Sequence, residues 1–197
     1  MITRAIEDRI NNALAKKKAV TIMGPRQVGK STLADAIIPK DARILEINGD
    51  NTDVQTMFIN VDEAKMKVLI GNKNFLFVDE AQKIENVGNM LKIVAEKFKD
   101  VKIIVTGSSV FKLAEAVKES LTGRKREFRL YPLSFKEMAD ETSTLEESRM
   151  IDHRLIYGYY PEVVTSPGDE KDVLKELIDS YLYKDVMEEN NIAKPDK

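Results

Sequence analysis

The segment from Gly24 to Ser31, GPRQVGKS, limits the fold of this chain more than any other stretch. It follows the apolar run 19–23 and precedes a helix-like segment over residues 31–38, which stops before Pro39. Two glycines five positions apart let the backbone curl around an anion, because no Cβ blocks the turn or the close approach. The helix that begins there adds its positive end to the same point. The sequence therefore predicts a strand-loop-helix unit whose loop binds a phosphate group.

The same alternation of strand and helix continues along the chain. Short apolar runs predict four further strands, and segments with apolar residues at three-and-four spacing predict the helices around them. We expect strands at 19–23, 44–47, 75–78, 101–105 and 126–130, and helices at 2–14, 31–38, 54–64 as one continuous helix, 87–98 and 110–119. The predicted fold class is α/β, with an open, parallel five-stranded sheet and helices on both faces, as in P-loop NTPases.

Strand signals end near Pro132. Beyond it, Ser134 and Thr144 each precede a glutamate by three positions, which is the capping-box spacing of a helix start. A later apolar stripe predicts a long helix over 173–182. We therefore expect two parts, a P-loop core with its N-terminal helix at 1–132 and a small helical lid region at 133–197.

Composition excludes several kinds of site. The chain has no cysteine, a single histidine, His153, and a formal net charge of −2. Disulfides, thiolate metal sites and sites built on two imidazoles are therefore excluded. The charge lacks the basic excess of a dedicated nucleic-acid clamp. The amino terminus is charged and no window approaches the apolar length of a membrane span, so we expect a cytoplasmic protein without a membrane partner.

The residues of the phosphate loop have separate chemical tasks in this interpretation. Lys30 is expected to be an exposed charge that reaches the β- and γ-phosphates of ATP, and the Ser31 hydroxyl is expected to ligate Mg²⁺. The predicted nucleotide-binding residues are Gly24, Pro25, Arg26, Gln27, Val28, Gly29, Lys30, Ser31 and Thr32.

Two carboxylates follow the strand predicted at 75–78. Asp79 is expected to hold Mg²⁺ through water, and Glu80 is expected to orient and deprotonate the attacking water. At the end of the next strand, Thr106 and Ser108 are candidates to sense the γ-phosphate, although a helix N-cap uses the same residue types. A paired Asp-Glu favours hydrolysis by water over transfer to a substrate hydroxyl.

Several segments together resemble a known family. They are GPRQVGKS at 24–31, FVDEAQ at 77–82, VTGSS at 105–109, LTGR at 121–124 and LYPLSF at 130–135, with YGYYPEVV at 157–164 and YLYKDV at 181–186 as later landmarks. The set is similar to prokaryotic AAA+-type ATPases that carry a C-terminal domain of unknown function, although Tyr159 and Lys184 stand where Gly and Arg are more usual. The resemblance implies ATP hydrolysis on an AAA+-like core with a helical lid from Ser134. It also implies that the chain is an amino-terminal fragment or a shortened member.

The same resemblance gives Arg124 a candidate role. In ATPases of this kind an arginine at this position is expected to face the γ-phosphate, from a neighbouring subunit of a homo-oligomer or from the same chain after closure. The alternative is a basic surface cluster, because other cations follow it over residues 125–129. The predicted catalytic residues are thus Glu80, Lys30, Arg124 and Ser108.

These features predict an ATPase that uses Mg²⁺ and whose nucleotide cycle drives a conformational change on a protein partner that the sequence does not identify. No Asn-Lys-x-Asp motif is found, which argues against a GTPase. Two alternatives stay open. One is a nucleotide-gated binding module with negligible turnover, which could engage DNA through the basic cluster at 124–129, and the other is a small-molecule kinase. Product analysis separates them, because an ATPase releases free phosphate whereas a kinase yields a phosphorylated metabolite.

Overall fold

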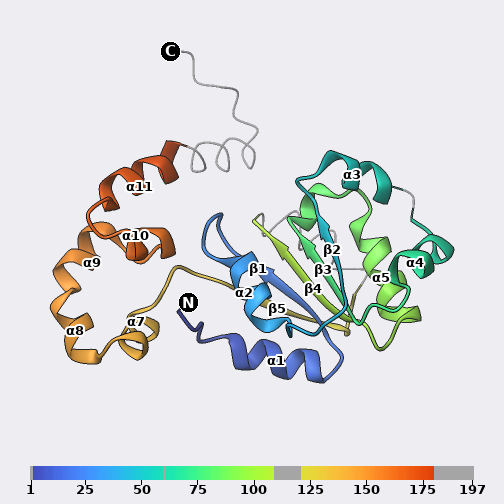
Figure 1. Ribbon diagram of the computed structural model, residues 1–197, viewed down its shortest axis with the longest axis horizontal. Helices are drawn as coiled ribbons and strands as arrows, with labels where there is room; N and C mark the ends of the chain where they lie inside the picture. Colours follow the sequence, from blue (N-terminus) through green and yellow to red (C-terminus); the bar gives the residue numbers. More distant parts are fainter. Residues whose placement is uncertain (1, 60, 109–120, 180–197) are drawn as a thin grey trace, which may run out of the picture. The chain divides into compact units, whose positions relative to one another are not determined.

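Five strands form one parallel sheet in the computed structural model, which describes residues 2–59, 61–108 and 121–179 (Figure 1). The strand order is β2-β3-β4-β1-β5, and every neighbouring pair is parallel. The strands are β1 Ala19–Met23, β2 Ile44–Asn48, β3 Phe75–Asp79, β4 Lys102–Gly107 and β5 Lys125–Arg129. The predicted α/β class and the five-stranded parallel sheet are confirmed.

The connections between strands place helices on both faces of this sheet. The chain moves in one direction across the sheet from β1 to β2 and in the opposite direction from β2 to β3 and from β3 to β4. Because parallel crossovers are right-handed, α2 (Lys30–Ile37) covers one face, and α3 (Thr52–Phe58), α4 (Glu63–Ile70) and α5 (Val87–Lys97) cover the other. The N-terminal helix α1 (Glu7–Ala15) packs against α2 and β1, and so joins the first face.

Buried apolar side chains hold these layers together. All five residues of β1 are buried, as expected for a strand covered on both faces. Leu76, Val78 and Val105 project from the sheet into the cluster formed with Met90, Leu91 and Val94 of α5. Burying one such side chain contributes about 1.5–3 kcal/mol relative to leaving it in water. This packing therefore fixes the positions of the ends of the central strands.

The helix predicted over 54–64 is wrong in its continuity, because the structure has two helices there. Asp62 has extended backbone, with ψ 178°, and its side chain accepts a hydrogen bond from the N–H of Lys65 at 2.8 Å. An aspartate in this conformation starts a new helix, so α4 begins at Glu63. The predicted helix at 110–119 lies outside the described residues.

The helices after Tyr131 belong to a second compact unit, which also includes Met1–Thr3 and Arg26–Val28, and they are described by themselves. Its helices are α7 Phe135–Glu141, α8 Thr144–Arg149, α9 Ile151–Tyr157, α10 Pro161–Thr165 and α11 Glu170–Leu177. Ser134 forms the predicted capping box with Glu137. The predicted N-cap at Thr144 is wrong by one residue, because Ser143 caps α8 by accepting from the N–H of Glu146 at 3.1 Å.

Glu147, the glutamate of that expected second box, has another role. It is buried and binds Arg154 of α9 through Nε at 3.0 Å, which ties α8 to α9. The predicted stripe over 173–182 is described only in part, since Val173, Leu174 and Leu177 are half-buried on α11 and residues 180–182 lie outside the described ranges. Among the described helices, none has the length and apolar character needed to cross a membrane.

Candidate active site

The phosphate loop joins the carboxyl end of β1 to the first turn of α2. Gly29 is the N-cap of α2 and has φ 92°, a left-handed conformation that strongly favours glycine. Gln27 also has a positive φ, of 57°. Alternation between left- and right-handed residues directs successive N–H groups toward one side, which is the backbone form of an anion-binding nest. The left-handed backbone at Gly29 therefore explains why the second fixed position of the motif is a glycine.

Lys30 is buried, which corrects the expectation of an exposed charge. Its side chain is 4% exposed, and its ammonium donates to the carbonyl oxygens of Gly24 at 3.1 Å and Pro25 at 2.9 Å. The Glu80 carboxylate lies 3.8 Å away through Oε1. A buried cation needs such partners because transfer from water disfavours its charged form. Replacing Lys30 therefore disturbs the site as well as any phosphate contact.

Ser31 and Asp79 lie together, as their predicted metal roles require. The Ser31 hydroxyl donates to Asp79 Oδ2 at 2.8 Å, and Thr106 at the end of β4 donates to Asp79 Oδ1. A hydroxyl beside a carboxylate offers the hard oxygen donors that Mg²⁺ prefers, with water and phosphates completing its shell. No group of three or more Asp, Glu, His or Cys residues that could hold a metal ion occurs among the described residues. The residues present fit Mg²⁺.

Glu80 is held by a small polar network at the strand ends. Its backbone is left-handed, with φ 46° and ψ 44°, and its Oε2 accepts from Gln82 Nε2 at 2.6 Å and from Ser108 Oγ at 3.0 Å. Thr106 is therefore the partner of Asp79, and Ser108 is the partner of Glu80. The sequence interpretation gave Gln82 no role. Its side chain reaches Glu80 because Gln82 lies on the short 3-10 helix η1 (Ala81–Lys83), which the sequence did not predict.

Gly49 is a second residue that the sequence reasoning missed. Its N–H donates to the carbonyl of Asp79 at 2.8 Å, and a Cβ at this position would lie 2.3 Å from the carbonyl oxygen of Glu80. The loop after β2 thus touches the backbone that carries both carboxylates. Asn-Gly-Asp after a strand indicates a turn, but only the pairing of β2 with β3 shows what that turn contacts.

The remaining predicted nucleotide contacts lie along the loop and the first turn of α2. Pro25 and Thr32 are exposed, Arg26 is half-buried, and Val28 is fully buried. Thr32 belongs to the first turn of α2, where backbone N–H groups are not paired within the helix. Pro25 enters the site through its carbonyl, which accepts from Lys30.

Arg124 lies at the opposite edge of the sheet from the phosphate loop. It precedes β5, its carbonyl accepts from the N–H of Ala19 at 2.9 Å, and its guanidinium binds Glu96 of α5 at 2.8 Å. Gly24 follows the carboxyl end of β1, and Arg124 lies beside its amino end. The five residues of β1 place these two positions roughly 17 Å apart along the strand. Since the rigid sheet separates them, the expected role in cis after closure does not fit. A role in trans stays a prediction.

Comparison with known proteins agrees with this geometry. A family model described as "AAA domain" matches residues 16–139, which is more than half of the chain. The chain belongs to the AAA domain family. Its P-loop ATPase fold is therefore shown by the family match and by the sheet.

Relatives of this AAA domain are longer than the chain. It is 28% identical to the uncharacterized protein MJ1544 of Methanocaldococcus jannaschii, over 96% of this chain and 46% of that protein. It is 29% identical to an uncharacterized protein of Haemophilus influenzae, over 58% of this chain and 30% of that one. The chain thus spans less than half the length of these relatives.

One solved structure shares the fold of this AAA domain. It is the signal transduction ATPase with numerous domains PH0952 from Pyrococcus horikoshii, which has a tetratricopeptide repeat sensor. The TM-score is 0.54 at 14% identity, over 83% of this chain and 29% of that one. At this identity the likeness concerns the fold alone.

Proposed function

We propose that this AAA domain hydrolyses ATP with Mg²⁺ and that the nucleotide cycle drives a conformational change. The observation that carries the proposal is a pair of contacts between consecutive residues. The Ser31 hydroxyl is hydrogen-bonded to Asp79 at 2.8 Å, and the Lys30 ammonium lies 3.8 Å from the Glu80 carboxylate. The phosphate-binding lysine, the metal ligands and the general base thus converge at the carboxyl ends of β1 and β3. Open parallel sheets bind ligands at this edge.

Lys30 and the loop backbone bind the phosphates in this proposal. The ammonium exchanges its carbonyl partners, Gly24 and Pro25, for phosphate oxygens, and the N–H groups of the first turn of α2 add to the attraction. Mg²⁺, when bound, neutralises developing charge on the β- and γ-phosphates. Ser31 and Asp79 are the residues that would hold it.

Glu80 accepts a proton from the attacking water. Its Oε2 is kept in place by the Gln82 amide and the Ser108 hydroxyl, both donors, so it is ready as an acceptor at Oε1. A positioned carboxylate base contributes about 10² to 10⁴ fold in rate. Water fits this arrangement better than a substrate hydroxyl as the group that attacks the γ-phosphate, because Glu80 lies directly beside the phosphate-binding Lys30.

Hydrogen bonds between β3 and β4 give the nucleotide state a route into the sheet. Thr106 bonds Asp79 and Ser108 bonds Glu80, so a change at either carboxylate shifts the end of β4. The chain leaves β4 immediately after Gly107. We infer that the end of β4, at Thr106 to Ser108, transmits the loss of the γ-phosphate.

Steady-state product analysis tests the proposal. Purified protein with ATP and Mg²⁺ is expected to release ADP and free phosphate in equal amounts, and chelation of the metal is expected to stop release. Asp79→Asn keeps the side-chain shape and is expected to raise the Mg²⁺ concentration needed for half-maximal rate. Nucleotide binding without phosphate release, under conditions that support oligomers, would contradict hydrolysis and favour a binding module.

A further inference from the structure

A basic cavity lies at the amino edge of the sheet, opposite the phosphate loop. Its volume is about 280 Å³, and its apolar lining residues are Leu14, Ala15, Ala19, Ala95, Phe98, Val101 and Ile103. Six of its 14 lining residues are cations and one, Asp100, is an acid. The cations are Lys16, Lys17 and Lys18 after α1, Lys99 and Lys102 around the start of β4, and Arg124 before β5. The chain as a whole is slightly acidic, so this charge is concentrated.

The cavity lies at one end of a longer row of cations. Each strand of the sheet begins beside one: Arg43 before β2, Lys73 before β3, Lys102 on β4, Lys18 before β1 and Arg124 before β5. In the observed order these residues follow one another across the sheet edge. Neighbouring strands lie about 4.8 Å apart, so the row is about 19 Å long. We call this row, together with the cavity, the amino-edge track.

Helix termini explain only part of the track. Cations near a helix C-terminus offset its partial negative charge, and Lys16 and Lys97 stand at the ends of α1 and α5. That effect falls off within the last turn. Lys102, Arg43 and Arg124 open strands and are exposed, so helix stabilisation does not account for them.

The acids within the track are held by weak, exposed pairs. Lys17 binds Asp100 at 2.8 Å with side chains 67% and 96% exposed, and Arg124 binds Glu96 at 2.8 Å. Exposed ion pairs contribute little to stability, so an incoming anion can replace them. Within the described residues, Lys16, Lys99 and Lys102 have no carboxylate partner.

The geometry points to a binding site for single-stranded nucleic acid on the amino-edge track, with phosphates along the cations and an unstacked base in the cavity against Phe98. A linear row of point charges suits a linear polyanion with regular charge spacing. Lysine predominates in the cavity, and lysine binds phosphate as a point charge. Phe98 in the lining favours an exposed base over a stacked one, since sequence-tolerant binding of single strands combines a basic groove with aromatic stacking.

Fluorescence anisotropy with a labelled oligothymidylate of about 16 nucleotides tests this site. Binding is expected to weaken steeply with salt. The double variant Lys17→Gly and Lys99→Gln is expected to lower the magnitude of the slope of log K against log salt concentration by about 1.4, at about 0.7 per phosphate contact. Lys17 has φ 53° at the C-terminus of α1, where glycine is the favoured residue, so its replacement does not threaten the fold.

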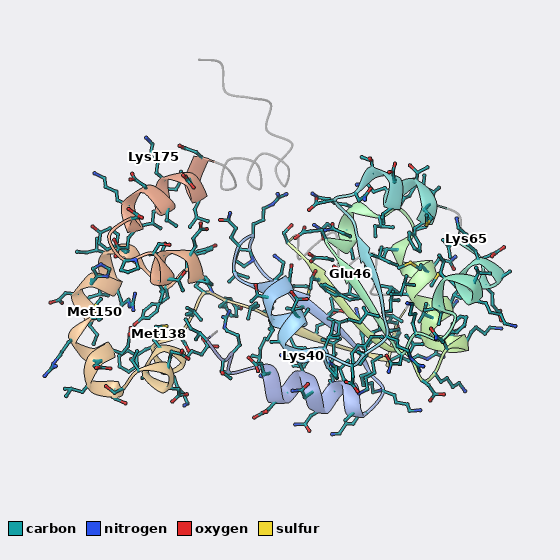
Figure 2. All side chains as sticks on the ribbon, in the orientation of Figure 1. Lys40, Glu46, Lys65, Met138, Met150 and Lys175 are labelled. Atoms are coloured by element: carbon teal, nitrogen blue, oxygen red, sulfur yellow. The ribbon has the colours of Figure 1, made fainter. Side chains whose placement is uncertain are left out.

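A second variant and a control separate the two parts of the site. Phe98→Leu is expected to weaken binding about tenfold with an unchanged salt slope, because it removes stacking and no charge. The matched control is Lys175→Gln, an exposed lysine on α11 in the other unit (Figure 2), which is expected to bind as the unmodified protein does. Saturating ATP with Mg²⁺ is expected not to compete, since the phosphate loop lies at the other edge.

Three outcomes would overturn the proposal. They are no binding of the oligothymidylate at low ionic strength, equal loss of binding in the control and in the double variant, and competition by polyglutamate as effective as that by unlabelled oligothymidylate. The last result would assign the track to an acidic protein partner. Tighter binding of a duplex than of the single strand would contradict the proposed insertion of an unstacked base into the cavity.

Discussion

Gly49→Ala tests whether the backbone of Glu80 must be held where the structure places it. A Cβ at residue 49 would lie 2.3 Å from the carbonyl oxygen of Glu80, 3.0 Å from its carbonyl carbon and 3.2 Å from the carbonyl oxygen of Asp79. Carbon-oxygen contacts ordinarily begin near 3.3 Å, so the two loops must separate by roughly 1 Å. Both obstructing groups are backbone, and no side-chain rotation relieves them.

A displacement of that size at a catalytic group costs about 10² in rate. Gly49→Ala is therefore expected to lower kcat for ATP hydrolysis about 100-fold, while ATP affinity by calorimetry changes only a few fold because Lys30 and the loop are untouched. Gly71→Ala is the control, since it forces an alanine into φ 48° but meets only Val68 O at 3.7 Å. It is expected to lower thermal stability and leave turnover unchanged. Wild-type turnover in Gly49→Ala would refute the reasoning.

The remaining predictions concern Lys30, Arg124 and Glu170. Lys30→Ala is expected to abolish ATP binding at sub-millimolar concentrations, and also to lower Tm because it leaves Glu80 without its buried cation; unchanged affinity by calorimetry would contradict the first part. Mixing Arg124→Ala with Lys30→Ala protein is expected to recover activity if Arg124 acts in trans, whereas no recovery together with a rate independent of protein concentration places it outside the mechanism. Hydrogen bonds from the backbone N–H groups of Glu170 and Gly168, with a smaller effect of His153, lower the pKa of Glu170 below 4.5. Its stabilising contribution is therefore present above that value and is lost as pH falls through the lowered pKa, and Glu170→Gln is expected to flatten the acid limb of a Tm-against-pH curve.

Local patterns were sufficient for most of the fold. The strands were predicted because short runs rich in β-branched and other apolar residues, bounded by turn signals, favour strands over helices. Ser31 and Asp79 were both assigned to the metal, and the phosphate loop and the third strand do end at the same edge. The break between α3 and α4 was missed because the apolar spacing continues through Asp62, whose capping role depends on its extended backbone.

Contacts between distant segments could not be predicted in this way. Lys30 was expected to be exposed because a lysine in a loop usually is, and its burial results from the carbonyls of Gly24 and Pro25 together with Glu80. Gly49 becomes important only through the register of β2 with β3. Arg124 was placed beside the phosphate by resemblance, and the strand order shows that it opens β5 at the far edge.

Comparison of Glu80→Gln with the unmodified protein tests the central claim most directly. The substitution keeps the side-chain shape and removes the proton acceptor beside Lys30. Hydrolysis requires that ATP and Mg²⁺ bind with an affinity within a few fold of the unmodified protein, while phosphate release falls by about 10² to 10⁴ fold. Release at an unchanged rate, or loss of binding and turnover by the same factor, would contradict the account of Glu80 as the base for water.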